Sequence, residues 1–205
     1  MDAINRYSKT DYAATPTLFF EFHGTERGVA EQAEMVQEIT AEFGARDYRW
    51  ATRQEDRNKL WEARHNAYYA ALALRPGCKG WPTDVCVPIS KLTECILETK
   101  ADLAAGNLLA PLVGHVGDGN FHLVYVLDMD NPEEIREAEV SNERLVQRAI
   151  RMGGTCTGEH GVGYGKMDYL PVEHGEDAVA VMAAIKQALD PKRLLNPGKI
   201  VPQGI

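Results

Sequence analysis

The segment 110–128, APLVGHVGDGNFHLVYVLD, limits the possible fold more than any other part of the sequence. Two runs rich in Val, Leu, Phe and Tyr flank the residues Gly-Asp-Gly-Asn, a pattern typical of two strands joined by a hairpin. Asp118-Gly119 is a favoured pair for a two-residue type I′ turn. Because a short hairpin joins antiparallel strands, the segment argues against a purely parallel sheet.

Further strand and helix patterns surround this hairpin. Apolar and aromatic runs predict strands over 17–24, 46–52 and 83–90, and a glycine-bounded run predicts extended chain over 154–163. Apolar residues three and four apart predict helices over about 26–43, 53–74, 91–105, 132–152 and 174–189. The expected fold is α+β and ferredoxin-like, with a mainly antiparallel sheet covered by helices. A doubly wound parallel sheet is the main alternative.

Composition narrows the classes of function. The 205 residues include 22 Lys and Arg and 30 Asp and Glu, giving a net charge of −8. This balance disfavours nucleic acid as a partner, since phosphates require a basic face. No apolar run approaches the roughly 18 residues of a membrane-spanning helix. The four cysteines form no Cys-x-x-Cys pair, so we expect reduced thiols and a cytoplasmic location.

His115 and His122 flank the predicted turn. If residues 118 and 119 form a two-residue turn, residue 115 lies directly opposite residue 122, and their Cβ atoms are about 5 Å apart on one face. Two imidazoles so placed can bind one metal ion. The alternative is a hairpin that carries two surface or hydrogen-bonded histidines.

The run TGEHGVGYGK (157–166) is the second candidate motif. Adjacent residues of an extended chain point to opposite sides, so Glu159 and His160 should have different roles. Glu159 could be a third metal ligand that leaves positions open for water or substrate. His160 could be a general base, because imidazole titrates near neutral pH. The alternative is a glycine-rich turn with exposed polar residues.

Arg64 and Lys79 are candidate anion-binding residues. An arginine offers a fork that suits a carboxylate, whereas a lysine offers a point charge. Their spacing alone favours the simpler interpretation, that both are solvated surface charges.

Together these motifs resemble the C-terminal half of FAD-linked D-2-hydroxyacid dehydrogenases. The resemblance is carried by HVGDGNFH, by GTCTGEHGVGYGK and by the closing LDPKRLLNPGKIV. The run RHNAYYAALALRPGCKGWPTDVCVPIS (64–90) is similar to the D-lactate dehydrogenase (cytochrome) branch. The resemblance implies one substrate- and metal-binding domain over 1–205, with 190–205 a tail that reaches the flavin. It also implies that the N-terminal FAD-binding domain is absent from this chain.

The resemblance assigns roles to particular residues. It implies a divalent metal, Zn or Mn, bound by His115, His122 and Glu159. It further implies that His160 is the catalytic base and that Arg64 binds the substrate carboxylate.

Three further residues follow from the same resemblance. In the related 2-hydroxyglutarate branch a lysine stands just before a Tyr-Asp pair; here Pro-Thr precedes Asp84, and the nearest lysine is Lys79. We expect a local insertion to have moved this substrate-binding lysine. Asn196 and Lys199 match the closing motif, which approaches the flavin cofactor.

The activity implied by the resemblance is oxidation of D-lactate or a related D-2-hydroxy acid to the 2-oxo acid, with FAD as hydride acceptor. The implied partners are the small hydroxy acid, the FAD-binding domain, an electron acceptor such as a cytochrome or quinone-linked carrier, and a second copy in a homodimer. The full enzyme would lie in the cytoplasm or peripherally on the inner membrane. Two alternatives stay open: a stand-alone metalloenzyme, such as an iron oxygenase or zinc hydrolase, and a non-catalytic metal- or carboxylate-binding module.

Overall fold

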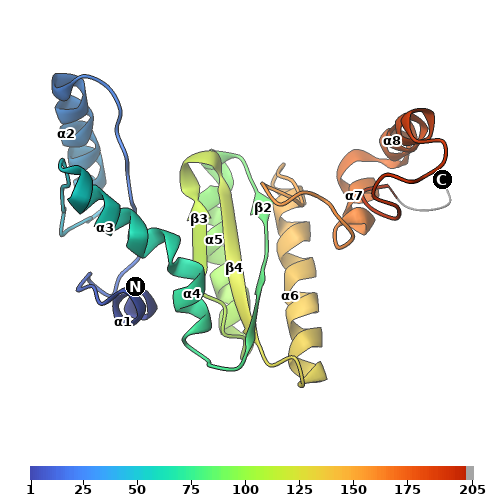
Figure 1. The fold of residues 1–205 in the computed structure, drawn as a ribbon, viewed down its shortest axis with the longest axis horizontal. Coiled ribbons are helices and arrows are strands. Elements are labelled where there is room, and N and C mark those ends of the chain that lie inside the picture. Colours follow the sequence, from blue (N-terminus) through green and yellow to red (C-terminus); the bar gives the residue numbers. More distant parts are fainter. Residues whose placement is uncertain (202–205) are drawn as a thin grey trace. The chain divides into compact units, whose positions relative to one another are not determined.

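The computed structural model describes residues 1–201, and the chain divides into two compact units (Figure 1). The first unit is Met1–Leu74 and the second begins at Arg75. Within the described residues, every β-strand belongs to the second unit. The second unit therefore contains the antiparallel sheet.

The first unit contains four helices: α1 (Asp2–Ser8), α2 (Glu26–Glu42), α3 (Gln54–His65) and α4 (Ala67–Leu72). Thr25 caps α2, since its side chain accepts a hydrogen bond from the Gly28 N–H at 3.2 Å. The single helix predicted over 53–74 is divided at Asn66, whose ψ of 3° departs from helical geometry. Asparagine favours such breaks because its side chain competes for backbone hydrogen bonds.

The strands predicted over 17–24 and 46–52 are wrong. Neither segment forms a regular element, and no backbone hydrogen bond within residues 1–201 joins either of them to a strand. An apolar pattern shows that a segment can be buried, but a strand also needs a partner for its N–H and C=O groups. Neither segment has that partner in the described structure.

The second unit is organised around β4 (Asn120–Leu127). This strand pairs antiparallel with β3 (Leu112–His115) along one edge. Along the other edge it pairs first with β1 (Lys79–Pro82) and then with β2 (Val85–Cys86), again antiparallel. The α+β fold with an antiparallel sheet is thus confirmed, and the parallel alternative is wrong.

Side chains alternate between the two faces of β4. One face packs in the apolar core with residues of α5 (Ile89–Ala104) and α6 (Pro132–Arg151). Figure 1 shows α5 behind β3 and β4. The Tyr125 hydroxyl donates a 2.9 Å hydrogen bond to Ser141 of α6, which ties this helix to the sheet. The opposite face of β4 carries His122.

The predicted helices over 91–105, 132–152 and 174–189 are confirmed, with small shifts at their ends. The last corresponds to α8 (Glu176–Leu189), and a further short helix that was not predicted, α7 (Leu170–His174), precedes it. Two short 3₁₀ helices complete the unit, η1 (Val116–Asp118) and η2 (Met167–Tyr169).

The segment after α6 is mostly irregular. An extended run was predicted over 154–163. One antiparallel bridge, between Thr155 and Cys86, joins this run to the sheet. The closing segment begins at Asp190, whose carboxylate accepts the backbone N–H groups of Leu194 and Leu195 at 2.9 Å each. Part of the predicted tail over 190–205, residues 202–205, lies outside the described residues. Every helix in the described part is too short or too polar to cross a lipid bilayer.

Candidate metal centre

The hairpin that carries His115 and His122 has a longer turn than predicted. Helix η1 and Gly119 together form the turn, and the register pairs His115 with Asn120 rather than with His122. The predicted direct pairing is therefore wrong by two residues. Because side chains alternate with a period of two, this even shift keeps both histidines on one face. Their ring centres lie 6.2 Å apart.

Gly119 explains the longer turn. Its φ is 78°, in the left-handed region, and its carbonyl accepts a hydrogen bond from the Val87 N–H at 3.0 Å. A Cβ at this position would lie 2.0 Å from the Val87 carbonyl oxygen. The turn is therefore shaped by a close contact with the segment after β2, which local sequence patterns do not reveal.

Glu159 brings a carboxylate to both histidines. Its Oε1 lies 3.0 Å from Nε2 of His122 and 3.6 Å from Nε2 of His115. The ligand atoms of the three residues all lie within 4.8 Å of one another. Two imidazoles and one carboxylate at this spacing can hold one divalent cation and leave positions open. The structure thus brings together the three residues that the sequence motifs singled out.

His122 is held in the tautomer that a metal ligand needs. Its Nδ1 lies 2.7 Å from the carbonyl oxygen of Thr83, and because a carbonyl only accepts, Nδ1 must carry the proton. Nε2 is then the ring nitrogen available to a metal, and it lies 3.0 Å from Glu159 Oε1. Metal-binding histidines commonly donate their other ring N–H to a carbonyl in this way.

His160 lies beside the three ligands. Its ring stacks on that of His122, with ring centres 5.0 Å apart and an interplanar angle of 8°. Its Nε2 is 3.8 Å from Oε1 of Glu159, too far for a hydrogen bond. The side chain is 44% exposed, so a small molecule can reach it. This position suits a general base next to a metal-bound substrate.

Asp84 is a site residue that the sequence motifs did not reveal. It lies between β1 and β2, is 1% exposed, and accepts hydrogen bonds from five residues. Burial by itself raises the pKa of Asp84, but hydrogen bonds outweigh burial and hold the pKa well below its usual range. The hydrogen bonds that lower this pKa most come from the His160 N–H, Lys166, Asn120 and the Glu159 N–H. The sequence does carry one signal for this residue: Asp84 is an acidic residue within the apolar strand run TDVCVP, where a buried side chain is expected.

Asp84, His122 and His160 form a second set of ligand atoms within the same distance limit. This set is the weaker candidate. The Nδ1 atom of His122 is committed to Thr83, and the Asp84 oxygens already accept several donors. A metal here would have to displace those hydrogen bonds, whereas the His122 Nε2 atom makes no hydrogen bond within residues 1–201 that a metal would displace.

The structure does not bring Lys79 to the cluster. Lys79 pairs with Leu127, at the opposite end of β4 from His122. Cross-strand partners share a face, so Lys79 lies on the helix-covered face of the sheet and His122 on the other. The lysine that does lie at the cluster is Lys166, whose Nζ is 3.0 Å from Asp84 Oδ2.

Arg64, Asn196 and Lys199 lie on other elements. Arg64 is in the last turn of α3, within the first unit. Asn196 adopts a left-handed φ of 44°, and the Lys199 ammonium lies 5.3 Å from the ring centre of Tyr164. The Ile200 N–H also donates to the Gly163 carbonyl at 2.8 Å. The closing segment therefore packs against the loop that follows His160.

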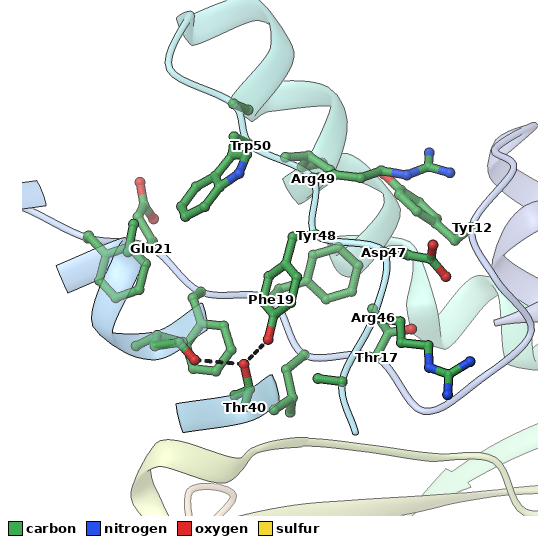
Figure 2. A pocket seen from close by; sticks show the side chains of 18 of the residues that line it. Tyr12, Thr17, Phe19, Glu21, Thr40, Arg46, Asp47, Tyr48, Arg49 and Trp50 are labelled. Carbon is green, nitrogen blue, oxygen red and sulfur yellow. Dashed lines mark hydrogen bonds between the residues drawn. The ribbon is translucent and has the colours of Figure 1, made fainter. Parts of the chain in front are cut away.

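A separate pocket of about 780 Å³ lies within the first unit. Figure 2 shows Phe19, Tyr48 and Trp50 among the side chains that surround it, with the Tyr48 hydroxyl hydrogen-bonded to Thr40. The unpaired segments that the sequence predicted as strands form much of its wall. No predicted site residue is among the residues that line it. The His and Glu cluster of the second unit is therefore the better candidate for chemistry.

The fold and the cluster define a class: an α+β domain with two histidines, a carboxylate and a further histidine at one end of an antiparallel sheet. The chain belongs to the family described as FAD linked oxidases, C-terminal domain, which matches residues 1–200.

Curated relatives support this membership. The chain is 52% identical over 201 residues to "Probable D-lactate dehydrogenase, mitochondrial" of Danio rerio, covering 98% of this chain and 40% of the relative. It is 44% identical over 200 residues to "D-lactate dehydrogenase (cytochrome), mitochondrial" of Arabidopsis thaliana, covering 98% and 35%. It is 31% identical over 194 residues to "Glycolate oxidase subunit GlcD" of Escherichia coli (strain K12), covering 92% and 38%. The chain thus spans 35% to 40% of the length of these relatives.

Proposed function

We propose that this chain is the substrate- and metal-binding part of an FAD-dependent dehydrogenase that oxidises D-lactate or a related D-2-hydroxy acid to the 2-oxo acid. The observation that carries the proposal is the convergence of His115, His122 and Glu159 beside His160. The relatives named as D-lactate dehydrogenases and as a glycolate oxidase subunit support the substrate class.

A divalent cation, Zn or Mn, fits the residues present. Imidazole nitrogen and carboxylate oxygen are ligands that both metals accept. His122 Nε2 and Glu159 Oε1 lie 3.0 Å apart, which brings two potential ligand atoms to one point and supports a cation there. Such a cation would supply Lewis acidity that lowers the pKa of the substrate hydroxyl, and FAD would supply the acceptor for the hydride from C2.

The residues of this chain have separate tasks in the proposal. His115, His122 and Glu159 bind the metal. His160 accepts the hydroxyl proton at its Nε2. Arg64 as the ligand of the substrate carboxylate stays a prediction from the resemblance.

The surroundings of the enzyme also stay predictions. Asn196 and Lys199 would approach the flavin of an FAD-binding domain. A cytochrome or a quinone-linked carrier would accept the electrons. The relatives from Danio rerio and Arabidopsis thaliana are named mitochondrial. A cytoplasmic or peripheral membrane location and a homodimer stay predictions as well.

A calorimetric titration tests the proposal. D-lactate should bind the chain in the presence of Mn²⁺ and should not bind after EDTA treatment. His115→Ala should abolish this Mn²⁺-dependent binding. His23→Ala, a change at an exposed histidine of the first unit, is the matched control and should leave it intact. D-lactate binding that is insensitive to EDTA would contradict the proposal.

Activity assays on the same chain distinguish the proposed function from the alternatives. Without an FAD-binding domain it should not oxidise D-lactate with an artificial electron acceptor. Iron-dependent oxygen uptake or hydrolysis of a model ester would instead indicate a stand-alone metalloenzyme, since two histidines and a carboxylate also serve those reactions.

A further inference from the structure

Asp84 joins three parts of the second unit. It stands where the edge partner of β4 changes from β1 to β2. The Asn120 amide donates to its Oδ1 at 2.9 Å, which connects it to β4. Its other donors come from the segment 157–166, which carries Glu159 and His160. A single buried carboxylate therefore links the sheet to the loop.

The hydrogen bonds fix the backbone of the two functional residues directly. The Glu159 N–H lies 3.1 Å from both Asp84 oxygens, and the His160 N–H lies 2.9 Å from Oδ2. The Thr157 hydroxyl donates to the same Oδ2 at 2.9 Å. Consecutive N–H groups on one carboxylate set the direction in which the two side chains leave the loop.

The loop can approach this closely because position 158 is glycine. A Cβ on Gly158 would lie 1.9 Å from the Asn120 Nδ2 and 2.8 Å from the Asp84 Oδ1. Asn120 is 5% exposed, and its amide also donates to the Val85 carbonyl at 3.0 Å, so it has little freedom to move aside. Gly158 is therefore required for the contact rather than for a turn.

Lys166 supplies the charge that the buried carboxylate needs. Its Nζ donates to both the carbonyl oxygen and the Oδ2 of Asp84, each at 3.0 Å. The Lys166 side chain is 18% exposed and comes from the same segment as Glu159. A buried carboxylate without a counter-charge is strongly unfavourable, so the pair holds both ends of the loop to one point.

We propose that Asp84, with Lys166 as its counter-ion, is the positioning residue that presents Glu159 and His160 to the metal centre. Asp84 is not a ligand itself, because its oxygens are occupied by backbone and side-chain donors. The proposal rests on the proposed function for what the site does. The placement of the loop can be tested without a metal.

Hydrogen exchange of the metal-free chain tests the placement. In Asp84→Asn the amides of Glu159 and His160 should exchange about ten- to a hundredfold faster than in the wild type, because hydrogen bonds to a charged acceptor are lost. Asp102→Asn is the matched control: that carboxylate is also paired with basic side chains, Arg144 and Arg148, but lies between α5 and α6. It should leave the two amides protected. Equal protection in Asp84→Asn and the wild type would overturn the proposal.

Binding of Mn²⁺ tests the consequence for the site. Asp84→Asn should weaken Mn²⁺ binding about ten- to a hundredfold and keep one site per chain, as expected for a group that orients a ligand. Complete loss of the site, as in a ligand variant, would overturn the positioning role. Binding as tight as in the wild type would overturn it too. If the wild type binds no metal, the proposed function fails, and hydrogen exchange still decides the role of Asp84.

Milder variants keep the test valid if Asp84→Asn does not fold. Thr157→Val removes one donor to Asp84 at nearly constant volume and should increase exchange at Glu159 and His160 severalfold. Lys166→Arg keeps the counter-charge and should restore most of the amide protection that Lys166→Met loses. If Lys166→Met leaves both amides as protected as Lys166→Arg does, Lys166 is not the counter-ion that the proposal requires.

Discussion

Gly119→Ala perturbs the turn that places His115 near His122. The left-handed φ of 78° costs an alanine about 1–2 kcal/mol. The new Cβ would also lie 2.0 Å from the Val87 carbonyl oxygen, so the backbone must move and the hydrogen bond from Val87 N–H is strained or lost. That bond contributes about 1 kcal/mol. We therefore expect Gly119→Ala to lower the free energy of unfolding by about 2–3 kcal/mol.

Gly117→Ala is the matched control in the same turn. Its φ lies outside the left-handed region, and a Cβ would meet no atom within 4 Å. Urea unfolding followed by circular dichroism should therefore show a change within about 0.5 kcal/mol for Gly117→Ala. Gly119→Ala should shift the urea midpoint by about 1 M or more. Equal stability of the two variants would refute the assignment of the turn to the contact with Val87.

Two further predictions concern the contacts of α6, namely its ion pairs with Asp102 of α5 and its hydrogen bond with Tyr125 of β4. Burial raises the pKa of Asp102, but hydrogen bonds from Arg144 and Arg148 outweigh it and hold this pKa below its usual range. A depressed folded-state pKa stabilises the protein above the unfolded value of about 3.9 and loses this contribution as the pH falls through the folded value. Asp102→Asn should thus be less stable near neutral pH and show a smaller loss of stability between pH 5 and pH 2, in urea titrations at fixed pH. Tyr125→Phe removes the hydroxyl that bonds the buried Ser141 and should cost about 1 kcal/mol in the same assay, whereas no measurable cost would contradict that hydrogen bond.

Patterns of residues within one segment predicted much of this fold. The alternating apolar residues around Asp118-Gly119 predicted the hairpin, and helical spacing predicted α2, α5, α6 and α8. The exact register was not predictable, because it depends on Gly119 packing against Val87, a residue 32 positions earlier. The strand patterns over 17–24 and 46–52 were misleading, since they report on apolar character and not on a pairing partner.

The candidate site shows the same division between local and distant information. His115, His122, Glu159 and His160 stand in two short motifs, and the structure places them together. Asp84 acts through residues 36 to 82 positions away in the sequence, so its spacing carried no signal. The substrate-binding role predicted for Lys79 relied on nearness in sequence, but the sheet puts Lys79 on the other face from His122.

The metal content of the purified chain tests the central claim most directly. After dialysis against Mn²⁺ or Zn²⁺, the wild type and His23→Ala should each retain one metal ion per chain, measured by elemental analysis. His122→Ala should lose metal binding, because it removes the Nε2 that faces Glu159. If His122→Ala retains as much metal as the wild type, or if the wild type retains none, the site at His115, His122 and Glu159 is not a metal centre.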